Sequence, residues 1–139
     1  MAIDLSNVEN RLITGLRLSL GVVFVWFGAL KIFGYNPVHD IVYSVFPFLA
    51  SGTGLISLGV LEFVIGAVLL LNFFRVPVHI LLILHLLGTF LTFLAAPNLM
   101  FQPYFPVLTL AGEFVFKNTV LAMAGLVVFV HARHKQFQK

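Results

Sequence analysis

Hydrophobic side chains are grouped along this chain in four long blocks, with most polar residues gathered between them. The blocks are residues 11–33, 55–74, 76–96 and 107–130. Each holds about the 20 residues that an α-helix needs to cross the hydrocarbon core of a bilayer. Apolar residues run continuously through each block, whereas a helix of a soluble protein keeps them on one face. The pattern predicts an all-α protein, a membrane four-helix bundle formed by a single domain over residues 1–139.

The connections between the blocks differ in length and composition. The second and third blocks are joined by a tight turn, with Pro77 near the start of the following helix, where its missing N–H costs little. In "NPVHDIVYSVFPF" (36–48), Asn36 is a candidate N-cap and the apolar residues recur on one helical face. We therefore expect a short amphipathic helix lying on the outer leaflet, with an irregular loop as the alternative. The segment "APNLMFQPYFP" (96–106) is expected to fold back as an aromatic anchor or as a cap over the bundle.

The composition supports a membrane protein and excludes several other classes. The chain is 60% hydrophobic and only 9% charged, and its mean hydropathy is +1.08. So few charges cannot cover the surface of a soluble domain of this size. The absence of cysteine from the sequence excludes disulfides, thiolate metal sites and iron–sulfur clusters within this chain. The formal net charge of +3 does not indicate nucleic-acid binding, because the basic residues lie at the ends of apolar blocks.

The positions of lysine and arginine predict how the chain crosses the membrane. The connections 34–54 and 97–106 contain neither residue type, and the opposite side holds Arg11, Arg17, Arg75, Arg133, Lys135 and Lys139. Under the positive-inside rule, the side with these residues is cytoplasmic. We therefore expect a multi-pass protein of the cytoplasmic (inner) membrane with both termini inside the cell. The Arg17 side chain is expected to extend to the cytoplasmic head groups.

The remaining ionisable residues lie within the apolar blocks, where charge is costly. Counting ~1.5 Å per residue places Lys31, Glu62, Glu113 and Lys117 in the outer half of the membrane, with His85 near the middle. An ionised group at mid-membrane costs at least ~2.5–3.5 kcal/mol, so such groups face inward and pair. Glu113 and Lys117 have the favourable i, i+4 order. The two acids and two bases balance in charge, and we expect them to converge on one buried polar cluster.

Two interpretations of this cluster are open from the residues alone. It is either a structural network that fixes the register of the helices, or the wall of a cavity that opens outward and binds a polar head group or relays protons. His85 can bind haem, hydrogen-bond a quinone carbonyl or bond a neighbouring helix, and Thr89 shares its helical face. Haem within one chain would need a second histidine at equal depth on a facing helix, and the sequence does not offer one. No metal motif is present and no cofactor is encoded.

Four segments, taken together, resemble one family. They are "FGALKIFG" (27–34), "LEFVIGAVLL" (61–70), "TFLTFLAAPN" (89–98) and "GEFVFKN" (112–118). Their order and spacing are similar to those of the DoxX-like superfamily, and in particular to its small YkgB/RclC-type membrane proteins. The resemblance implies a four-helix bundle in the bacterial cytoplasmic membrane, with relatives that include a subunit of a thiosulfate:quinone oxidoreductase and proteins of oxidative or reactive-chlorine stress responses.

The resemblance also carries the motif residues of the family over to Lys31, Glu62 and Lys117. Two positions depart from the family pattern: this chain has Glu113 where relatives often carry Arg, and Asn118 where they often carry Asp. One departure replaces a cation and the other removes an acid. The charge of a ligand bound by the relatives therefore does not predict the charge of a ligand of this chain.

These observations predict a membrane protein with a buried polar pocket for a quinone or another lipid-like, amphipathic small molecule, acting as a redox or stress-response subunit. The candidate ligand-binding residues are Lys31, Glu62, His85, Thr89, Glu113, Lys117 and Asn118. No catalytic residue is identified, and if the protein is enzymatic we expect a quinone-linked oxidoreductase subunit. The quinone follows from the resemblance alone. The alternatives are a non-enzymatic scaffold, assembly factor or accessory subunit of a larger membrane complex, and a small transporter that would need to form homo-oligomers.

Overall fold

The structure is a computed structural model that describes residues 5–73 and 75–137. Its four long helices are α1 (Leu5–Ile32), α3 (Gly52–Leu71), α4 (Arg75–Phe90) and α7 (Leu110–Phe137). The two long connections contain α2 (His39–Val45), the 3-10 turn η1 (Pro47–Leu49), α5 (Thr92–Ala95) and α6 (Pro97–Met100). The described residues form no β-strand beyond an isolated bridge between Phe101 and Leu108. The predicted all-α class is confirmed.

Four helical segments of the described chain are long and apolar enough to cross a membrane. They are Ser6–Ile32, Gly52–Leu71, Val76–Ala95 and Leu110–His134. These segments correspond to the four predicted spans, although α1 already begins at Leu5 and α7 continues to Phe137. The reason is that hydropathy marks where a helix meets lipid, whereas the hydrogen-bonded helix can continue into polar sequence beyond the bilayer.

The third span has a local irregularity near its end, at Leu91, where the backbone dihedral angles stay in the helical region. α4 ends at Phe90 and α5 begins at Thr92, and between them the N–H of Leu91 donates to the carbonyl of Gly88, three residues back. Thr89 adds to this distortion because its hydroxyl donates to the carbonyl of Leu86 at 2.7 Å, and such back-bonding bends helices. Irregular backbone at membrane depth is tolerated where it is buried in protein or lines a polar cavity.

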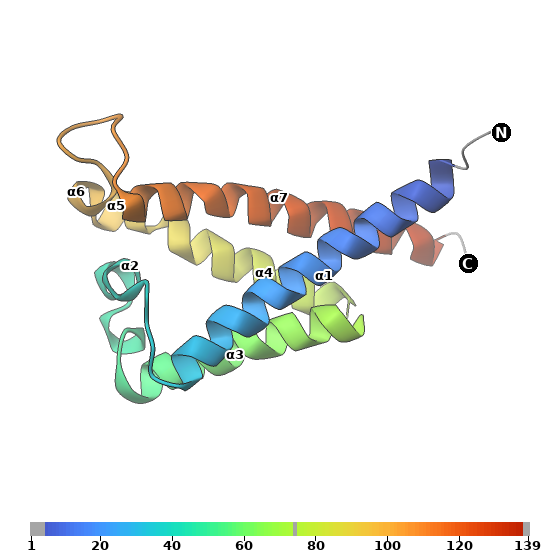
Figure 1. Cartoon of the computed structure of the whole chain (residues 1–139), viewed down its shortest axis with the longest axis horizontal. Helices are drawn as coiled ribbons and strands as arrows, with labels where there is room; N and C mark the ends of the chain where they lie inside the picture. The colour runs from blue at the N-terminus through green and yellow to red at the C-terminus, as the bar shows by residue number, and fades with distance from the viewer. Residues whose placement is uncertain (1–4, 74, 138–139) are drawn as a thin grey trace.

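The long helices form two antiparallel pairs, α1 with α3 and α4 with α7 (Figure 1). α1 begins and α7 ends at the same end of the bundle, which we call the terminal end. α2, α5 and α6 lie at the opposite end, which we call the long-loop end (Figure 1). The two pairs are close together toward the terminal end and diverge toward the long-loop end, where α2 lies between them (Figure 1).

Glycines bring the backbones of α1 and α3 into direct contact. A Cβ atom at Gly28 would lie 2.4 Å from the backbone nitrogen of Phe63, and a Cβ at Gly66 would lie 2.5 Å from the backbone nitrogen of Val25. Only a residue without a side chain fits at such a separation. In a membrane, where lipid is as apolar as leucine, this close van der Waals contact is a main source of helix association.

Arg17 holds the same pair of helices together near the terminal end. Its Nη1 atom donates to the carbonyls of Leu69 and Leu70, in the last turn of α3. The last carbonyls of a helix carry partial negative charge, so a guanidinium is a favourable partner for them. Arg17 therefore has partners within the bundle, and that its side chain extends to the head groups stays a prediction.

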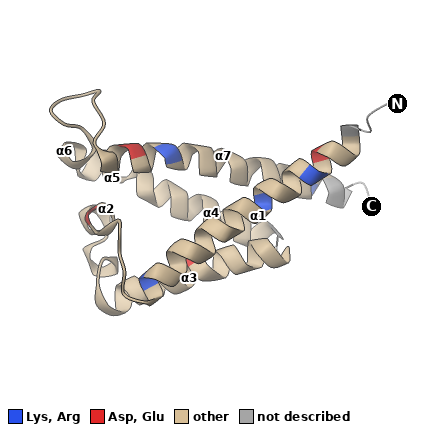
Figure 2. Ribbon diagram, viewed as in Figure 1, with Lys and Arg blue, Asp and Glu red and all other residues tan. Residues whose placement is uncertain are grey.

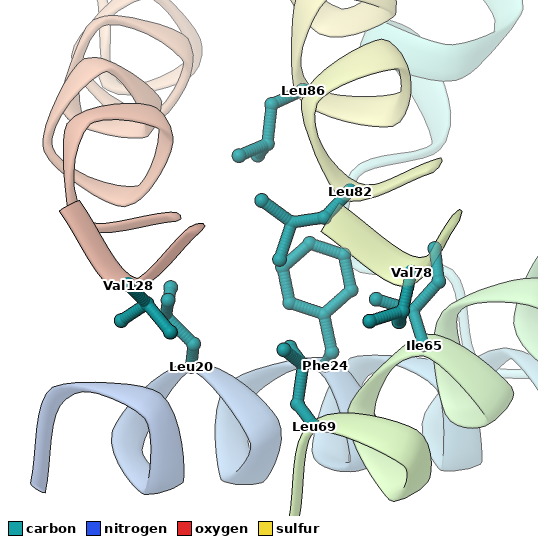
Figure 3. Close-up of a cluster of buried hydrophobic side chains, with 8 residues drawn as sticks. All are labelled: Leu20, Phe24, Ile65, Leu69, Val78, Leu82, Leu86 and Val128. Atoms are coloured by element: carbon teal, nitrogen blue, oxygen red, sulfur yellow. The ribbon is translucent and has the colours of Figure 1, made fainter. Parts of the chain in front are cut away.

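A cluster of buried hydrophobic side chains joins all four long helices on the side of the terminal end (Figure 3). It consists of Leu20, Phe24, Ile65, Leu69, Val78, Leu82, Leu86 and Val128. A smaller cluster at the long-loop end consists of Ile41 of α2, Met100 of α6 and Val115 of α7. Apolar packing thus joins the two helix pairs toward the terminal end, and it packs α2 against α6 and α7 at the long-loop end.

Candidate functional site

A cavity of about 700 Å³ lies between the two helix pairs and is bordered by both apolar clusters. Phe24 and Leu86 of the larger cluster and Ile41 of the smaller one contribute to its lining. Most of the lining side chains are apolar. The polar side chains that line it are Lys31, Glu62, His85, Thr89, Thr92, Lys117 and Asn118.

The apolar face of α2 covers this cavity. Val38, Ile41, Val42 and Val45 line it, and Ile41 is buried. The predicted short helix is confirmed, but the prediction that its apolar face lies on the outer leaflet is wrong, because the diverging helix pairs leave an apolar surface that α2 covers instead. Asn36 is not the N-cap, since its Nδ2 atom donates to the carbonyl of Ala50 at 3.1 Å and ties the two ends of the connection together.

Three ionisable side chains from three helices meet on the cavity wall. Lys31 Nζ of α1 donates to Glu62 Oε2 of α3 at 2.6 Å, and His85 Nε2 of α4 lies 3.1 Å from Glu62 Oε1. Because a carboxylate only accepts hydrogen bonds, Nε2 carries the proton in this contact and Nδ1 is left as the acceptor of a neutral ring. The side chains of Lys31, Glu62 and His85 are 3%, 6% and 15% exposed. We call these three residues the ionic triad.

Further contacts show how the charges of the ionic triad are accommodated among apolar helices. Both carboxylate oxygens of Glu62 have partners. Lys31 Nζ lies 5.6 Å from the ring centroid of Phe27, within the range of a cation–π interaction. Lys31 is also in the last turn of α1, near the negative end of the helix dipole. The ring of His85 meets Phe24 edge-on, with centroids 5.5 Å apart.

A second, uncharged polar contact joins α4 to α7. Asn118 Nδ2 donates to Thr89 Oγ1 at 3.0 Å, and the Thr89 hydroxyl in turn donates to the carbonyl of Leu86. Asn118 is buried and Thr89 is half-buried. The cavity wall therefore carries an ionic group and a neutral hydrogen-bonding group on different helices. The structure brings Lys31, Glu62, His85, Thr89 and Asn118 to one cavity, and their role in ligand binding stays a prediction.

The positions of Glu113 and Lys117 contradict the prediction that four charged side chains converge on one buried cluster. Lys117 Nζ lies 3.1 Å from Glu113 Oε2, but the two side chains are 72% and 51% exposed, and Glu113 does not line the cavity. Their predicted burial is wrong because α7 begins at Leu110, which puts Glu113 in its first turn, where an acid complements the helix dipole. Figure 2 shows how few charged residues the long helices carry, and that an acidic and a basic residue lie close together near the start of α7.

Lys117 nevertheless lines the cavity, and it also lines a second hollow of about 430 Å³. Phe27 and Phe114 line both spaces, and their rings meet edge-on with centroids 6.0 Å apart. The second hollow extends along α2, past Asn36 and His39. A charged side chain and an aromatic pair thus stand where the two spaces adjoin.

Thr92 was not among the predicted site residues. Its side chain lines the cavity and is 0% exposed. The signal in the sequence was its spacing, because His85, Thr89 and Thr92 stand at i, i+4 and i+7, which puts them on one helical face. The high average hydropathy of this segment concealed its polar face.

Among the described residues, no group of three or more His, Asp and Glu side chains lies close enough to hold a metal ion. His131 lies near the terminal end, with Nδ1 3.2 Å from Glu9 Oε1 and Nε2 3.1 Å from Asn10 Oδ1. It therefore links α7 to α1 and lies apart from the cavity.

Comparisons with known proteins support one relationship. A profile of the DoxX family matches residues 12–95, which include all of the ionic triad and Thr89 and Thr92. The comparisons with curated proteins and with solved structures found no match. The matched segment covers more than half of the chain and begins in α1 and ends in α5. The chain is therefore a multi-pass membrane protein that belongs to the DoxX family.

Proposed function

We propose that this protein binds a quinone or a similar amphipathic small molecule in the cavity, as the membrane subunit of a redox or stress-response system. The observation that carries the proposal is the ionic triad on the wall of a mainly apolar cavity. Ligand sites are commonly apolar spaces of about 300–1,000 Å³ with a few convergent polar groups. Ionisable groups within a membrane are costly and are retained mostly where they serve a function.

The chemistry of the ionic triad suits a ligand whose oxygens gain and lose protons. Glu62 fixes the Nε2 proton of His85, so Nδ1 can accept a hydrogen bond from a ligand hydroxyl. A proton taken up at Nδ1 can be matched by release of the Nε2 proton to Glu62. Lys31 keeps the carboxylate charge neutralised and has further N–H groups that can donate to a ligand carbonyl. In this proposal the chain supplies binding and proton transfer, and electrons are exchanged with a partner protein.

The distribution of Lys and Arg supports a cytoplasmic membrane location with both termini inside the cell. In that orientation the long-loop end faces outward and the cavity lies in the outer half of the bilayer. Leu61 of α3 and Leu84 of α4 line the cavity and are also exposed on the surface. A lipid-soluble ligand could therefore enter sideways from the membrane between these two helices.

The proposal is tested by thermal unfolding of the purified protein in detergent with decylubiquinone as the probe. We expect the probe to raise the Tm of the wild-type protein and to raise it less in a His85→Gln variant, which loses the ring nitrogens of the ionic triad. His131→Gln is the matched control, since His131 lies near the terminal end, and it should respond as the wild type does. Ligand that saturates the site at 100 times its Kd stabilises by about 2.7 kcal/mol, which is readily measured.

A wild-type protein that shows no shift with decylubiquinone, and that carries no quinone in a solvent extract analysed by mass spectrometry, would overturn the quinone proposal. If such a protein instead co-purified with another membrane protein, the accessory-subunit alternative would be favoured.

A further inference from the structure

The cavity reaches the surface of the bundle between α3 and α4, at two leucines. Leu61 of α3 and Leu84 of α4 line the cavity, and they are also 38% and 59% exposed. Each is followed directly by a member of the ionic triad, Glu62 after Leu61 and His85 after Leu84. Both helices therefore pass from a lipid-facing leucine to an inward ionisable group within one residue, about 100° around the helix axis. We call this edge of the cavity the α3–α4 opening.

Gly88 widens the α3–α4 opening because it has no side chain. It lies one turn after Leu84 on the same face of α4, lines the cavity and is half-buried. Apart from the backbone of its own helix, a Cβ atom at Gly88 would meet only Cε2 of Phe46, at 4.0 Å, and Phe46 also lines the cavity. A side chain at this position would therefore extend into free space between α4 and the connection that follows α2.

The setting of Gly88 differs from that of the glycines between α1 and α3. Glycine is less favourable than alanine within a helix, so a helical glycine needs an offsetting contact or a use for its missing side chain. At Gly28 the contact is evident, because a Cβ there would lie 2.4 Å from the backbone nitrogen of Phe63. At Gly88 no such close contact exists, and what the missing side chain provides is free space beside the cavity.

The size of the cavity limits how much of a membrane-soluble molecule it encloses. Its volume of about 700 Å³ is that of a site for a drug-sized ligand. A molecule with a polar head at the ionic triad and a long apolar tail exceeds this space, so its tail has to leave the protein. The α3–α4 opening offers an apolar way out, since Leu61 and Leu84 flank it and Gly88 leaves the passage free of a side chain.

We infer that the cavity takes a long-tailed amphiphile, bound with its polar head at the ionic triad and with its tail crossing Gly88 and leaving the protein between Leu61 and Leu84. The inference rests on the proposed function in that it needs a ligand in the cavity, but it does not need that ligand to be a quinone. It makes Gly88 a specificity-determining residue that admits the tail. It also makes binding insensitive to the group at the far end of the tail.

The first test measures the ligand-free protein. Gly88→Ala adds a Cβ atom at an ordinary contact distance from one ring atom and introduces a better helix former, so its Tm should equal or exceed that of the wild type. Gly28→Ala is the contrasting variant, and its Tm should fall because its Cβ would meet the backbone of α3. A Gly88→Ala protein that loses as much stability as Gly28→Ala would show that the glycine is needed for packing, and would overturn the inference.

The second test measures the Kd of decylubiquinone for the protein in lipid nanodiscs. Gly88→Leu places a branched side chain in the passage, and we expect it to weaken binding by about tenfold. Gly15→Leu is the matched control, because a Cβ at Gly15 also meets nothing within 4 Å and Gly15 does not line the cavity. This control should bind the probe as the wild type does. Equal affinities of Gly88→Leu and the wild type would overturn the inference.

The third test examines the far end of the tail. A decylubiquinone whose tail ends in a bulky, uncharged pyrenyl group should bind the wild type within about threefold of the affinity of decylubiquinone, because the end of the tail lies outside the protein. A site that encloses the whole molecule would reject the added group. A loss of affinity of about tenfold or more would therefore contradict a tail that leaves the cavity.

The outcomes separate the two proposals when 1-decanoylglycerol is measured beside decylubiquinone. If decylubiquinone does not bind, but 1-decanoylglycerol binds with the same dependence on Gly88 and tolerates a pyrenyl group on its tail, the quinone proposal fails and the inferred binding mode stands. If decylubiquinone binds and Gly88→Leu does not weaken it, the quinone proposal stands and the inferred binding mode is overturned. The binding mode is also overturned if neither probe binds the wild-type protein.

Discussion

The Lys31–Glu62 pair of the ionic triad and the Glu113–Lys117 pair use the same residue types within similar apolar sequence, yet they occupy different environments. Glu62 and Lys31 come from different helices, and their side chains are almost completely buried. Glu113 and Lys117 come from adjacent turns of one helix, and their side chains are mostly exposed. The same two kinds of charge are therefore a buried element of the bundle in one region and a surface pair in the other.

This difference teaches that burial, and not the presence of an ion pair, decides how much such a pair matters. An exposed i, i+4 pair contributes a few tenths of a kcal/mol. A buried charge that loses its partner is strongly destabilising, because the desolvation cost stays while the attraction is gone. Three variants test the contrast, and they are taken from the largest expected effect to the smallest.

Glu62→Leu should have the largest effect. It removes the carboxylate that neutralises Lys31 and fixes His85, and it leaves a buried ammonium unpaired. We expect a loss of about 3–5 kcal/mol in the free energy of unfolding, measured by SDS titration in mixed micelles. The double variant Lys31→Met/Glu62→Leu should recover at least about 1 kcal/mol of this loss, since it removes both charges. Additive losses in the double variant would contradict a coupled pair.

Asn118→Leu should have an intermediate effect. It removes the neutral hydrogen bond to Thr89 that joins α7 to α4, without leaving a charge unpaired. The expected loss is about 0.5–1.5 kcal/mol in the same unfolding assay. Thr119→Val, at the exposed neighbouring position, serves as the control and should unfold as the wild type does. A loss as large as that of Glu62→Leu would contradict this expectation, because it would show that the neutral contact stabilises the protein by much more than one hydrogen bond.

Lys117→Ala should have the smallest effect. Its side chain is 72% exposed and pairs only across one turn of α7, so we expect a loss of about 0.3–0.5 kcal/mol. Should Lys117→Ala unfold as easily as Glu62→Leu, the distinction between the two regions would collapse.

Much of the fold follows from the sequence because membrane physics constrains it strongly. Twenty continuous apolar residues have few alternatives to a spanning helix, so the four spans were predictable. The meeting of Lys31, Glu62 and His85 was predictable for a related reason, since charged groups within apolar blocks must face inward and find partners.

The features that the sequence did not reveal depend on local backbone geometry. The depth of Glu113 depends on where α7 starts, and a shift from Val107 to Leu110 moves it into the first turn. The one-residue step between α4 and α5 falls inside a continuous apolar segment, so hydropathy does not mark it. The covering position of α2 depends on how far the two helix pairs diverge, which is a tertiary property. Periodicity gives the face of a residue, but it does not give its exposure.

The glycine contacts between α1 and α3 have a mechanical consequence. At Gly28 and Gly59 no side chain separates the two backbones, so these helices cannot slide past each other by exchanging rotamers. α1 and α3 thus keep a fixed separation and register, and any change in the width of the cavity has to come from a movement of α4, α7 or α2 relative to this pair.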